Sequence, residues 1–296
     1  MTTAAAPVRT AGDRPALPRG TDGTPGAARL HAAFAREARD RRVALVPYVV
    51  AGYPDAATSL TAALAAIDAG ADVLEVGLPY SDPLADGTTL QRASAVALRN
   101  GATFDRSLDL LRAIHEARPA APVVPMAYVN QALGNGDPVG RLVRLAAAGA
   151  SGVILADLTP DEGAPVEAAA REAGLALVYL VTPTTSPTRR AMIAASTGGF
   201  LYTVSLVGVT GARSQLPREV THFLAQVRAV ARGPVAVGFG VSRPAHVRRL
   251  ARSADGVIVA SALVDALGPD GRDVARMARL VGQLARAGRW SGAQHP

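Results

Sequence analysis

The chain reads Ala69-Gly70-Ala71-Asp72-Val73 at the joint between an alanine-rich stretch and an apolar run. Gly70 readily adopts the left-handed conformation that ends a helix, and the turn after it leads directly into the next run. The same sequence pattern recurs at Ala148-Gly149-Ala150-Ser151-Gly152-Val153 and at Ala173-Gly174-Leu175. Successive βα units are joined by short turns of this kind. These joints therefore predict a chain built from repeated βα units.

Outward from the joints, short apolar runs alternate with stretches of helical period. The predicted strands are 43–50, 72–77, 122–128, 152–156, 175–181, 200–205, 234–239 and 256–259. The predicted helices include 56–69, 88–99, 139–148, 165–173, 218–231 and 243–251. Strands that alternate with helices are parallel and buried on both faces, which fits their nearly continuous apolar character. Eight such units in about 265 residues predict a single (β/α)8 TIM barrel, with a doubly wound open sheet as the alternative.

The ends of the chain differ in composition from its middle. Residues 1–27 mix Ala, Pro, Gly, Thr and Arg without a period, which is typical of a flexible tail. We expect the barrel to occupy residues 28–290, with a short second tail at 291–296. Neither a secretory signal nor an apolar run of about eighteen residues is present, so we expect a cytoplasmic protein without a membrane span.

Two residue types are missing from the 296-residue chain, cysteine and lysine. Their absence removes thiolate nucleophiles, sulfur-ligated metals and Schiff-base chemistry on a lysine side chain. The five histidines are isolated in the sequence, without the short spacing of a metal site, and we expect them to be ordinary surface residues: His31, His115, His222, His246 and His295.

The net charge of +7 is concentrated at the two ends. Residues 1–42 hold eight arginines against four acidic residues, and residues 271–296 hold five against one, so the rest of the chain is nearly neutral. With only 4% aromatic residues available to stack on bases, this distribution argues against a nucleic-acid partner.

A (β/α)8 barrel carries its active site on the loops that follow the strands, and the loop after the second strand is rich in polar groups. Strand alternation places Glu75 on one face with Val73 and Gly77. Burial there raises the pKa of a carboxyl group toward the range useful for acid/base catalysis. Asp86 follows in a loop with two prolines. Two carboxyl groups in different environments suit a division of acid and base roles.

Each carboxylate also has a structural interpretation. Glu75 fits equally well as a buried ion-pair partner. Asp86 also fits as the N-cap of the helix predicted at 88–99. The sequence of the loop favours the catalytic interpretation without excluding the other.

Small residues follow the last two predicted strands, at Val237-Gly238-Phe239-Gly240-Val241-Ser242 and Val257-Ile258-Val259-Ala260-Ser261-Ala262. Small side chains let the main chain approach an anion, and a helix N-terminus adds about half a positive charge. This is the place where barrels of this type often bind phosphate. The glycine-rich loop at 205–213 is long enough to close over such a site.

Three segments together resemble the tryptophan synthase alpha subunit family: Glu75-Val-Gly-Leu-Pro-Tyr-Ser-Asp-Pro-Leu-Ala-Asp-Gly87, Gly208-Val-Thr-Gly211 and Gly238-Phe-Gly-Val-Ser242. The likeness runs from about residue 30 to about residue 285. It implies a TIM barrel that cleaves indole-3-glycerol phosphate into indole and glyceraldehyde 3-phosphate by a retro-aldol reaction in tryptophan biosynthesis. It also implies a beta-subunit partner in an alpha2-beta2 heterotetramer, with the Asp82-Pro83 and Asn130 regions facing that partner.

The resemblance assigns roles to individual residues. Glu75 is the general acid/base, and Asp86 accepts a hydrogen bond from the indole N–H. The implied substrate-binding residues are Tyr48, Tyr128, Tyr202 and Thr210. The implied phosphate-binding residues are Gly211, Gly240, Ala260 and Ser261. No cofactor is expected, because the protonated indole ring accepts the electrons that otherwise require a lysine imine or a metal ion.

The sequence departs from the family pattern at four positions, where Val50, Thr88, Thr159 and Ala260 replace Thr, Pro, Pro and Gly. Three other functions stay open. A free-standing lyase would release indole without a beta subunit, and a degenerate copy would bind a beta subunit without catalysis. Another phosphate-binding barrel, such as a sugar isomerase, would carry its acid/base pair on different strands.

Overall fold

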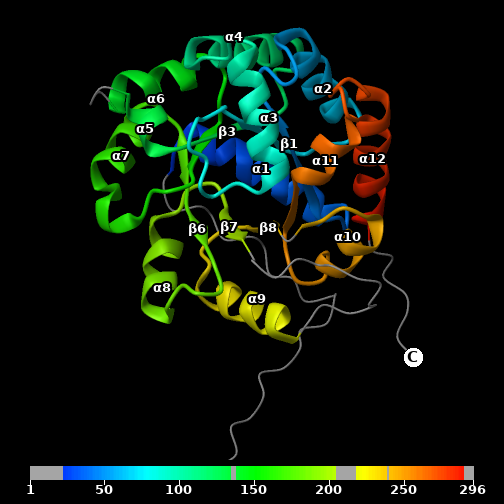
Figure 1. Ribbon diagram of the computed structural model, residues 1–296. Helices are drawn as coiled ribbons and strands as arrows, with labels where there is room; N and C mark the ends of the chain where they lie inside the picture. Colours follow the sequence, from blue (N-terminus) through cyan, green and yellow to red (C-terminus); the bar gives the residue numbers. More distant parts are fainter. Residues whose placement is uncertain (1–22, 135–137, 205–217, 239, 290–296) are drawn as a thin grey trace, which may run out of the picture.

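The computed structural model describes residues 23–134, 138–204, 218–238 and 240–289. Its strands are β1 Ala44–Val50, β2 Leu74–Gly77, β3 Val123–Ala127, β4 Gly152–Leu155, β5 Ala176–Val178, β6 Leu180–Val181, β7 Leu201–Val204, β8 Val235–Gly238 and β9 Gly256–Val259. Its helices are α1 Pro25–Arg39, α2 Ala56–Asp68, α3 Thr88–Arg99, α4 Phe104–Ala117, α5 Val129–Leu133, α6 Pro138–Ala147, α7 Pro160–Glu172, α8 Pro187–Ser196, α9 Arg218–Val230, α10 Pro244–Leu250, α11 Ser261–Ala266 and α12 Val274–Ala287. Figure 1 shows the helices surrounding the strands.

The strands form one parallel sheet in the order β5-β4-β3-β2-β1-β9-β8-β7-β6. The two edge strands belong to a single run of chain, which is interrupted at Tyr179. The backbone N–H of Tyr179 donates to the Thr197 hydroxyl (3.0 Å) instead of to a neighbouring strand, which explains the interruption. Its carbonyl still accepts from the N–H of Tyr202 (3.1 Å). The sheet therefore curls into a nearly closed barrel, and the predicted TIM-barrel fold is confirmed.

Side chains fill the barrel interior in layers. The interior cluster contains Ala44, Val46, Val73, Val124, Ile154, Ala176, Val178, Phe200, Tyr202, Ala236 and Ile258, together with Leu30 and Phe34 from α1. Phe34 packs on Phe200 with ring centroids 5.5 Å apart. A Cβ atom at Gly256 would lie 2.6 Å from the Phe34 ring, so a glycine is required there. Helix α1 thus closes the end of the barrel opposite the strand C-termini.

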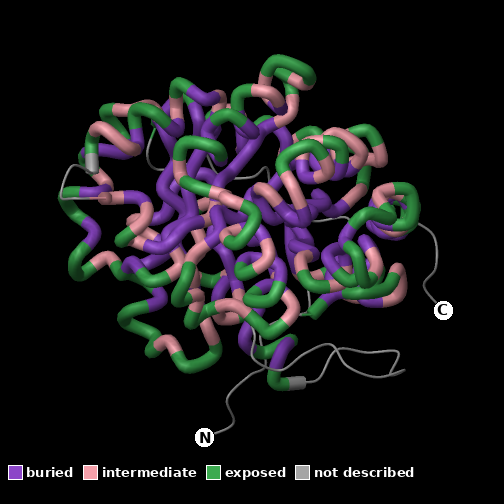
Figure 2. The backbone as a smooth tube through the Cα atoms, turned by 45° about the horizontal axis from the view of Figure 1, so that its top comes forward, coloured by how far each residue is buried: buried purple, intermediate pink, exposed green. Residues whose placement is uncertain are grey.

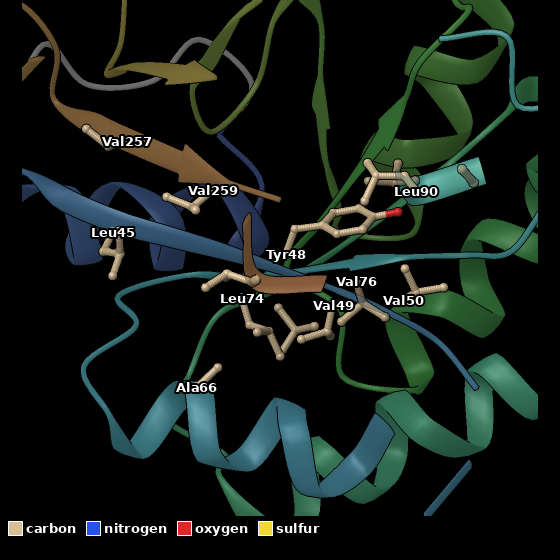
Figure 3. Packing of buried hydrophobic residues seen from close by; sticks show 14 of the residues in the cluster. Leu45, Tyr48, Val49, Val50, Ala66, Leu74, Val76, Leu90, Val257 and Val259 are labelled. Carbon is tan, nitrogen blue, oxygen red and sulfur yellow. The ribbon is translucent and has the colours of Figure 1, made fainter. Parts of the chain in front are cut away.

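A second apolar layer lies between the strands and the outer helices. Val49 and Tyr48 leave β1 on opposite sides, with Val49 on the side of Ala66 in α2 (Figure 3). The tube in Figure 2 is buried along the strands and exposed on the outer helices and loops. Residues such as Val49 and Val76 therefore pack against the outer helices. The residues next to them in each strand face the barrel interior.

Two aspartates fix the starts of strands in the same way. Asp72 precedes β2 and accepts from the backbone N–H of Leu45 in β1 (2.8 Å) and from Arg42 (2.8 Å). Asp255 precedes β9 and accepts from the N–H of Val235 in β8 (2.9 Å), while Arg228 pairs with it at 2.7 Å. Each carboxylate satisfies an N–H at the start of a neighbouring strand and sets the strand register.

The first helix includes the last few residues of the stretch that the sequence assigned to the N-terminal tail. It starts at Pro25, whereas the sequence assigned residues up to 27 to the tail. The Thr24 hydroxyl accepts from the N–H of Ala27 (3.1 Å), and proline is favoured at the first helical position. Residues 1–22 and 290–296, which make up most of the two predicted tails, lie outside the described residues.

Candidate active site

Glu75 lies in β2 and points into the barrel interior. The strand alternation placed it on one buried face with Val73 and Gly77, and the structure shows that this face lines the interior. Its neighbours in register are Tyr48 of β1 and Val124 of β3. The residue is 1% exposed, and neither carboxylate oxygen has a hydrogen-bond partner within the described part of the chain. Burial raises its pKa to about 8, and the charge of Asp86 adds to the increase. Such a group is mostly protonated at neutral pH and both donates and accepts a proton readily.

The ion-pair interpretation of Glu75 does not hold for the described residues. Their ion pairs join arginines to other acidic side chains, such as Arg42 to Glu37 and Asp72 near the closed end of the barrel. Burying a carboxyl group without a hydrogen-bond or ion-pair partner costs folding free energy. Groups that are buried at such a cost are typical of functional sites.

Asp86 is half-buried at the end of the loop between β2 and α3. Burial raises its pKa to about 6, below that of Glu75, so Asp86 is mostly ionised when Glu75 is mostly protonated. The N-cap interpretation of Asp86 is wrong, because Gly87 is the N-cap of α3 and no side chain caps that helix. The two carboxyl groups thus differ in charge near neutral pH.

The backbone around Asp86 is fixed by three hydrogen bonds. The N–H of Asp86 donates to the Pro83 carbonyl (3.0 Å), and Gln91 Nε2 donates to the Asp86 carbonyl (3.0 Å). The Tyr128 hydroxyl accepts from the N–H of Ala85 (2.9 Å). Sequence reasoning missed Gln91, whose only signal is a polar side chain in the first turn of the predicted helix.

The structure brings Tyr48 and Tyr202 to the two carboxyl groups. Both tyrosines are buried, at 3% and 8% exposed. Burial raises the pKa of each hydroxyl well above 10, and the charges of Glu75 and Asp86 raise both further. Both hydroxyls are therefore neutral at physiological pH. Tyr128 joins the same group, because the charge of Asp86 is the second cause, after burial, that raises its pKa to about 12.

Glycines make room for the interior tyrosines. A Cβ atom at Gly77 would lie 1.7 Å from the Tyr48 hydroxyl, and one at Gly238 would lie 3.3 Å from the Tyr202 hydroxyl. The absence of a side chain at Gly77 is therefore what allows the Tyr48 ring to lie across the end of β2.

The described residues that the sequence predicts to bind phosphate follow the neighbouring strands β8 and β9, at the same end of the barrel as the loop that carries Asp86. Gly240 has a φ of +62°, a conformation that favours glycine. Ala260 is the N-cap of α11 with a φ of −117°, which is compatible with an alanine where the family has glycine. Ser261 is the exposed first residue of α11. Thr210 and Gly211 lie outside the described residues.

The expectation of surface histidines is wrong for His246, which is 4% exposed. Its Nδ1 accepts from the N–H of Ser242 (3.3 Å) in the loop after β8. Among the described residues, no group of three or more His, Asp or Glu side chains is arranged to hold a metal ion. No described helix combines the length and apolarity needed to span a membrane.

Comparisons with known proteins agree with this geometry. The model of the family described as "Tryptophan synthase alpha chain" matches residues 34–287. The chain is 46% identical to the tryptophan synthase alpha chain of Roseiflexus castenholzii over 256 residues, which cover 86% of this chain and 97% of that one. It is 44% identical to the alpha chain of Deinococcus radiodurans over 255 residues, covering 86% and 93%.

Solved structures show the same likeness. A chain of Mycobacterium tuberculosis tryptophan synthase matches with a TM-score of 0.82 and 40% identity, covering 89% of this chain and 99% of that one. A protein from Aquifex aeolicus matches with a TM-score of 0.81 and 34% identity, covering 88% and 99%. The family match includes every residue assigned above to the candidate site.

Proposed function

The chain belongs to the tryptophan synthase alpha chain family, and from this premise we propose that Glu75 and Asp86 perform its reaction. The reaction is the cleavage of indole-3-glycerol phosphate into indole and glyceraldehyde 3-phosphate, which makes the protein a carbon–carbon lyase of tryptophan biosynthesis. One observation carries the residue assignment. Glu75 is a fully buried carboxyl group without a partner in the described residues, and it lies close enough to Asp86 for their charges to interact.

In the proposed mechanism, protonated Glu75 donates its proton to C3 of the indole ring, which leaves a positive charge on the ring nitrogen. The bond between C3 and the glycerol phosphate chain then breaks, and its electrons return to the ring. The hydroxyl on the departing carbon becomes the aldehyde as its proton passes to the Glu75 carboxylate. Glu75 ends protonated, as it began, so one group serves as both acid and base.

Asp86 supplies a negative charge opposite the positive charge that develops on the indole nitrogen. With a pKa of about 6 it is ionised at neutral pH, and it accepts a hydrogen bond from the indole N–H. Its interaction strengthens as the ring nitrogen becomes positive, so it stabilises the transition state more than the bound substrate.

Two sets of residues at the C-terminal ends of the strands are assigned to substrate binding. We assign the indole pocket to Tyr48 and Tyr128, and we assign Tyr202 to substrate binding beside the catalytic carboxyl group; all three are buried. We assign the phosphate to a second set: Gly211, Gly240, Ala260 and Ser261. Thr210 stays assigned to the first, substrate-binding set, and both Thr210 and Gly211 lie outside the described residues. Backbone amides and the Ser261 hydroxyl are suitable donors for phosphate oxygens.

Family members pair with a beta subunit, and we propose an alpha2-beta2 heterotetramer in the cytoplasm. Exposed residues of the loop after β2 support this, since Leu84 is 92% exposed beside Asp82 and Pro83. Asn130 is exposed nearby and donates to the Tyr80 hydroxyl (3.4 Å). Light scattering on the mixed subunits and cleavage assays with and without the beta subunit test this assembly. An unchanged mass and rate would favour a free-standing lyase.

Substitution of Glu75→Gln tests the central assignment. Glutamine keeps the size of the side chain but cannot exchange a proton, so indole release at saturating substrate should fall roughly a hundredfold or more. The control is Glu167→Gln, which alters a half-buried glutamate that accepts from Tyr179 outside the barrel mouth (2.8 Å). Near-normal indole release by Glu75→Gln would show that another group moves the proton.

A further inference from the structure

The Tyr128 hydroxyl contacts the backbone one residue before Asp86. It accepts from the N–H of Ala85 (2.9 Å) across 43 positions of sequence, and the tyrosine is only 6% exposed. A buried tyrosine is a rigid support, because two side-chain angles define its position. The contact therefore fixes the peptide that leads into Asp86.

The same tyrosine also supports the beginning of the loop. Its ring stacks on Tyr80 with centroids 5.0 Å apart and an interplanar angle of 25°. Three residues further along α5, Gln131 Nε2 donates to the Pro79 carbonyl (2.6 Å). The segment from Pro79 to Ala85 is thus held at both ends by Tyr128 and α5. Ser81, Asp82 and Leu84 between these ends are exposed, so the end contacts set the position of the loop.

The support is itself fixed to the barrel. The N–H of Val129, the first residue of α5, donates to Asp157 Oδ1 (2.8 Å) in the loop after β4. Tyr128 is the N-cap of α5, and its own N–H donates to Gln131 Oε1 (3.3 Å). A chain of contacts therefore connects the loop after β4, through α5, to the loop after β2. These contacts make Tyr128 part of the rigid scaffold.

We propose that Tyr128 is a positioning residue that aims Asp86 at the substrate through its hydrogen bond to Ala85. This inference rests on the catalytic role proposed above for Asp86. The ring of Tyr128 is free to line the indole pocket, while the hydroxyl holds the loop. Small errors in the placement of a catalytic group lower the rate strongly, so one hydrogen bond at this point influences turnover.

The first test is Tyr128→Phe, which keeps the ring and its stacking on Tyr80 but removes the hydroxyl. We expect kcat for indole-3-glycerol phosphate cleavage to fall roughly five- to tenfold, with KM changed less than about twofold. Tyr179→Phe is the matched control, because it removes a hydroxyl that is bonded to Glu167 away from the barrel mouth. Its kcat should stay near that of the unmodified protein.

The second test combines Tyr128→Phe with Asp86→Asn. If the tyrosine acts through Asp86, the double variant is no slower than Asp86→Asn alone. If the two losses multiply, or if Tyr128→Phe leaves kcat unchanged while Asp86→Asn lowers it, the positioning role is wrong and the role of Asp86 stands. Normal turnover of Asp86→Asn would instead overturn the proposed function of Asp86, and the positioning role with it.

Discussion

Tyr48 and Glu75 are register partners on β1 and β2, and both side chains enter the barrel interior. Parallel pairing places their Cβ atoms on the same face of the sheet. Burial is the main cause of the raised pKa of Tyr48, and the charges of Asp86 and Glu75 raise it further. Burial at this position, together with the charge of Asp86, keeps Glu75 mostly protonated at neutral pH.

The pH dependence of cleavage should report both carboxyl groups. Asp86 must be ionised and Glu75 protonated, so kcat/KM should rise with pH around a pKa of about 6 and fall around a pKa of about 8. Steady-state indole release between pH 5 and 9 measures this profile. A constant kcat/KM across this range would contradict the assignment of charges.

The stability of the protein should also depend on Glu75. Its pKa is 4.5 in an ordinary environment and about 8 in the fold, so between these values the folded state keeps a proton that the unfolded state releases. The contribution of Glu75 to stability is therefore undiminished below the lower value and declines as pH rises toward the upper one, by about 1.4 kcal/mol per pH unit.

Glu75→Gln should lack this decline. The difference in unfolding free energy between the variant and the unmodified protein should grow in favour of the variant from pH 5 to pH 8, as measured by urea unfolding. A gain of stability together with a loss of activity is expected of a catalytic group and not of a structural one. A difference that does not change with pH would mean that Glu75 has an ordinary pKa in the fold.

Gly77→Ala should impair the site from within the barrel. The added Cβ would meet the Tyr48 hydroxyl at 1.7 Å, so Tyr48 must move. We expect a loss of about 1–3 kcal/mol of stability and a lower kcat, because the displaced ring disturbs the surroundings of Glu75. Gly233→Ala is the control, since its nearest neighbour would be His31 Nε2 at an ordinary 3.6 Å. Equal effects of the two substitutions would exclude a specific role for the space at Gly77.

Ser261→Ala should weaken binding more than catalysis. Loss of a hydrogen bond to a charged phosphate should raise KM roughly tenfold and leave kcat nearly unchanged. Inhibition by inorganic phosphate should weaken in parallel. Ser253→Ala, in the turn before β9, is the control at the other end of the same strand. A fall in kcat at constant KM would place Ser261 outside the phosphate site.

Local sequence patterns predicted many of the helices and strands but not all of the residues at which they begin and end. The helix predicted at 165–173 begins at Pro160, with Pro165 inside it, because Thr159 is the N-cap and acidic residues occupy the first turn. Either proline fits the start of a helix, and only packing decides between them. The interruption at Tyr179 likewise depends on Thr197, which is distant in sequence and invisible to local periodicity.

The sequence by itself determined the alternation of strands and helices, the glycine joints, and the burial of Glu75 on one face of its strand. These properties depend on residue type and on periods of two or 3.6 residues, which short segments carry within themselves. Only the tertiary structure decided that Glu75 lacks an ion-pair partner among the described residues, that Gly87 and not Asp86 caps α3, and that Tyr128 holds the loop of Asp86. Burial and pKa depend on which distant segments meet, and that is settled when the parallel strands close into a barrel.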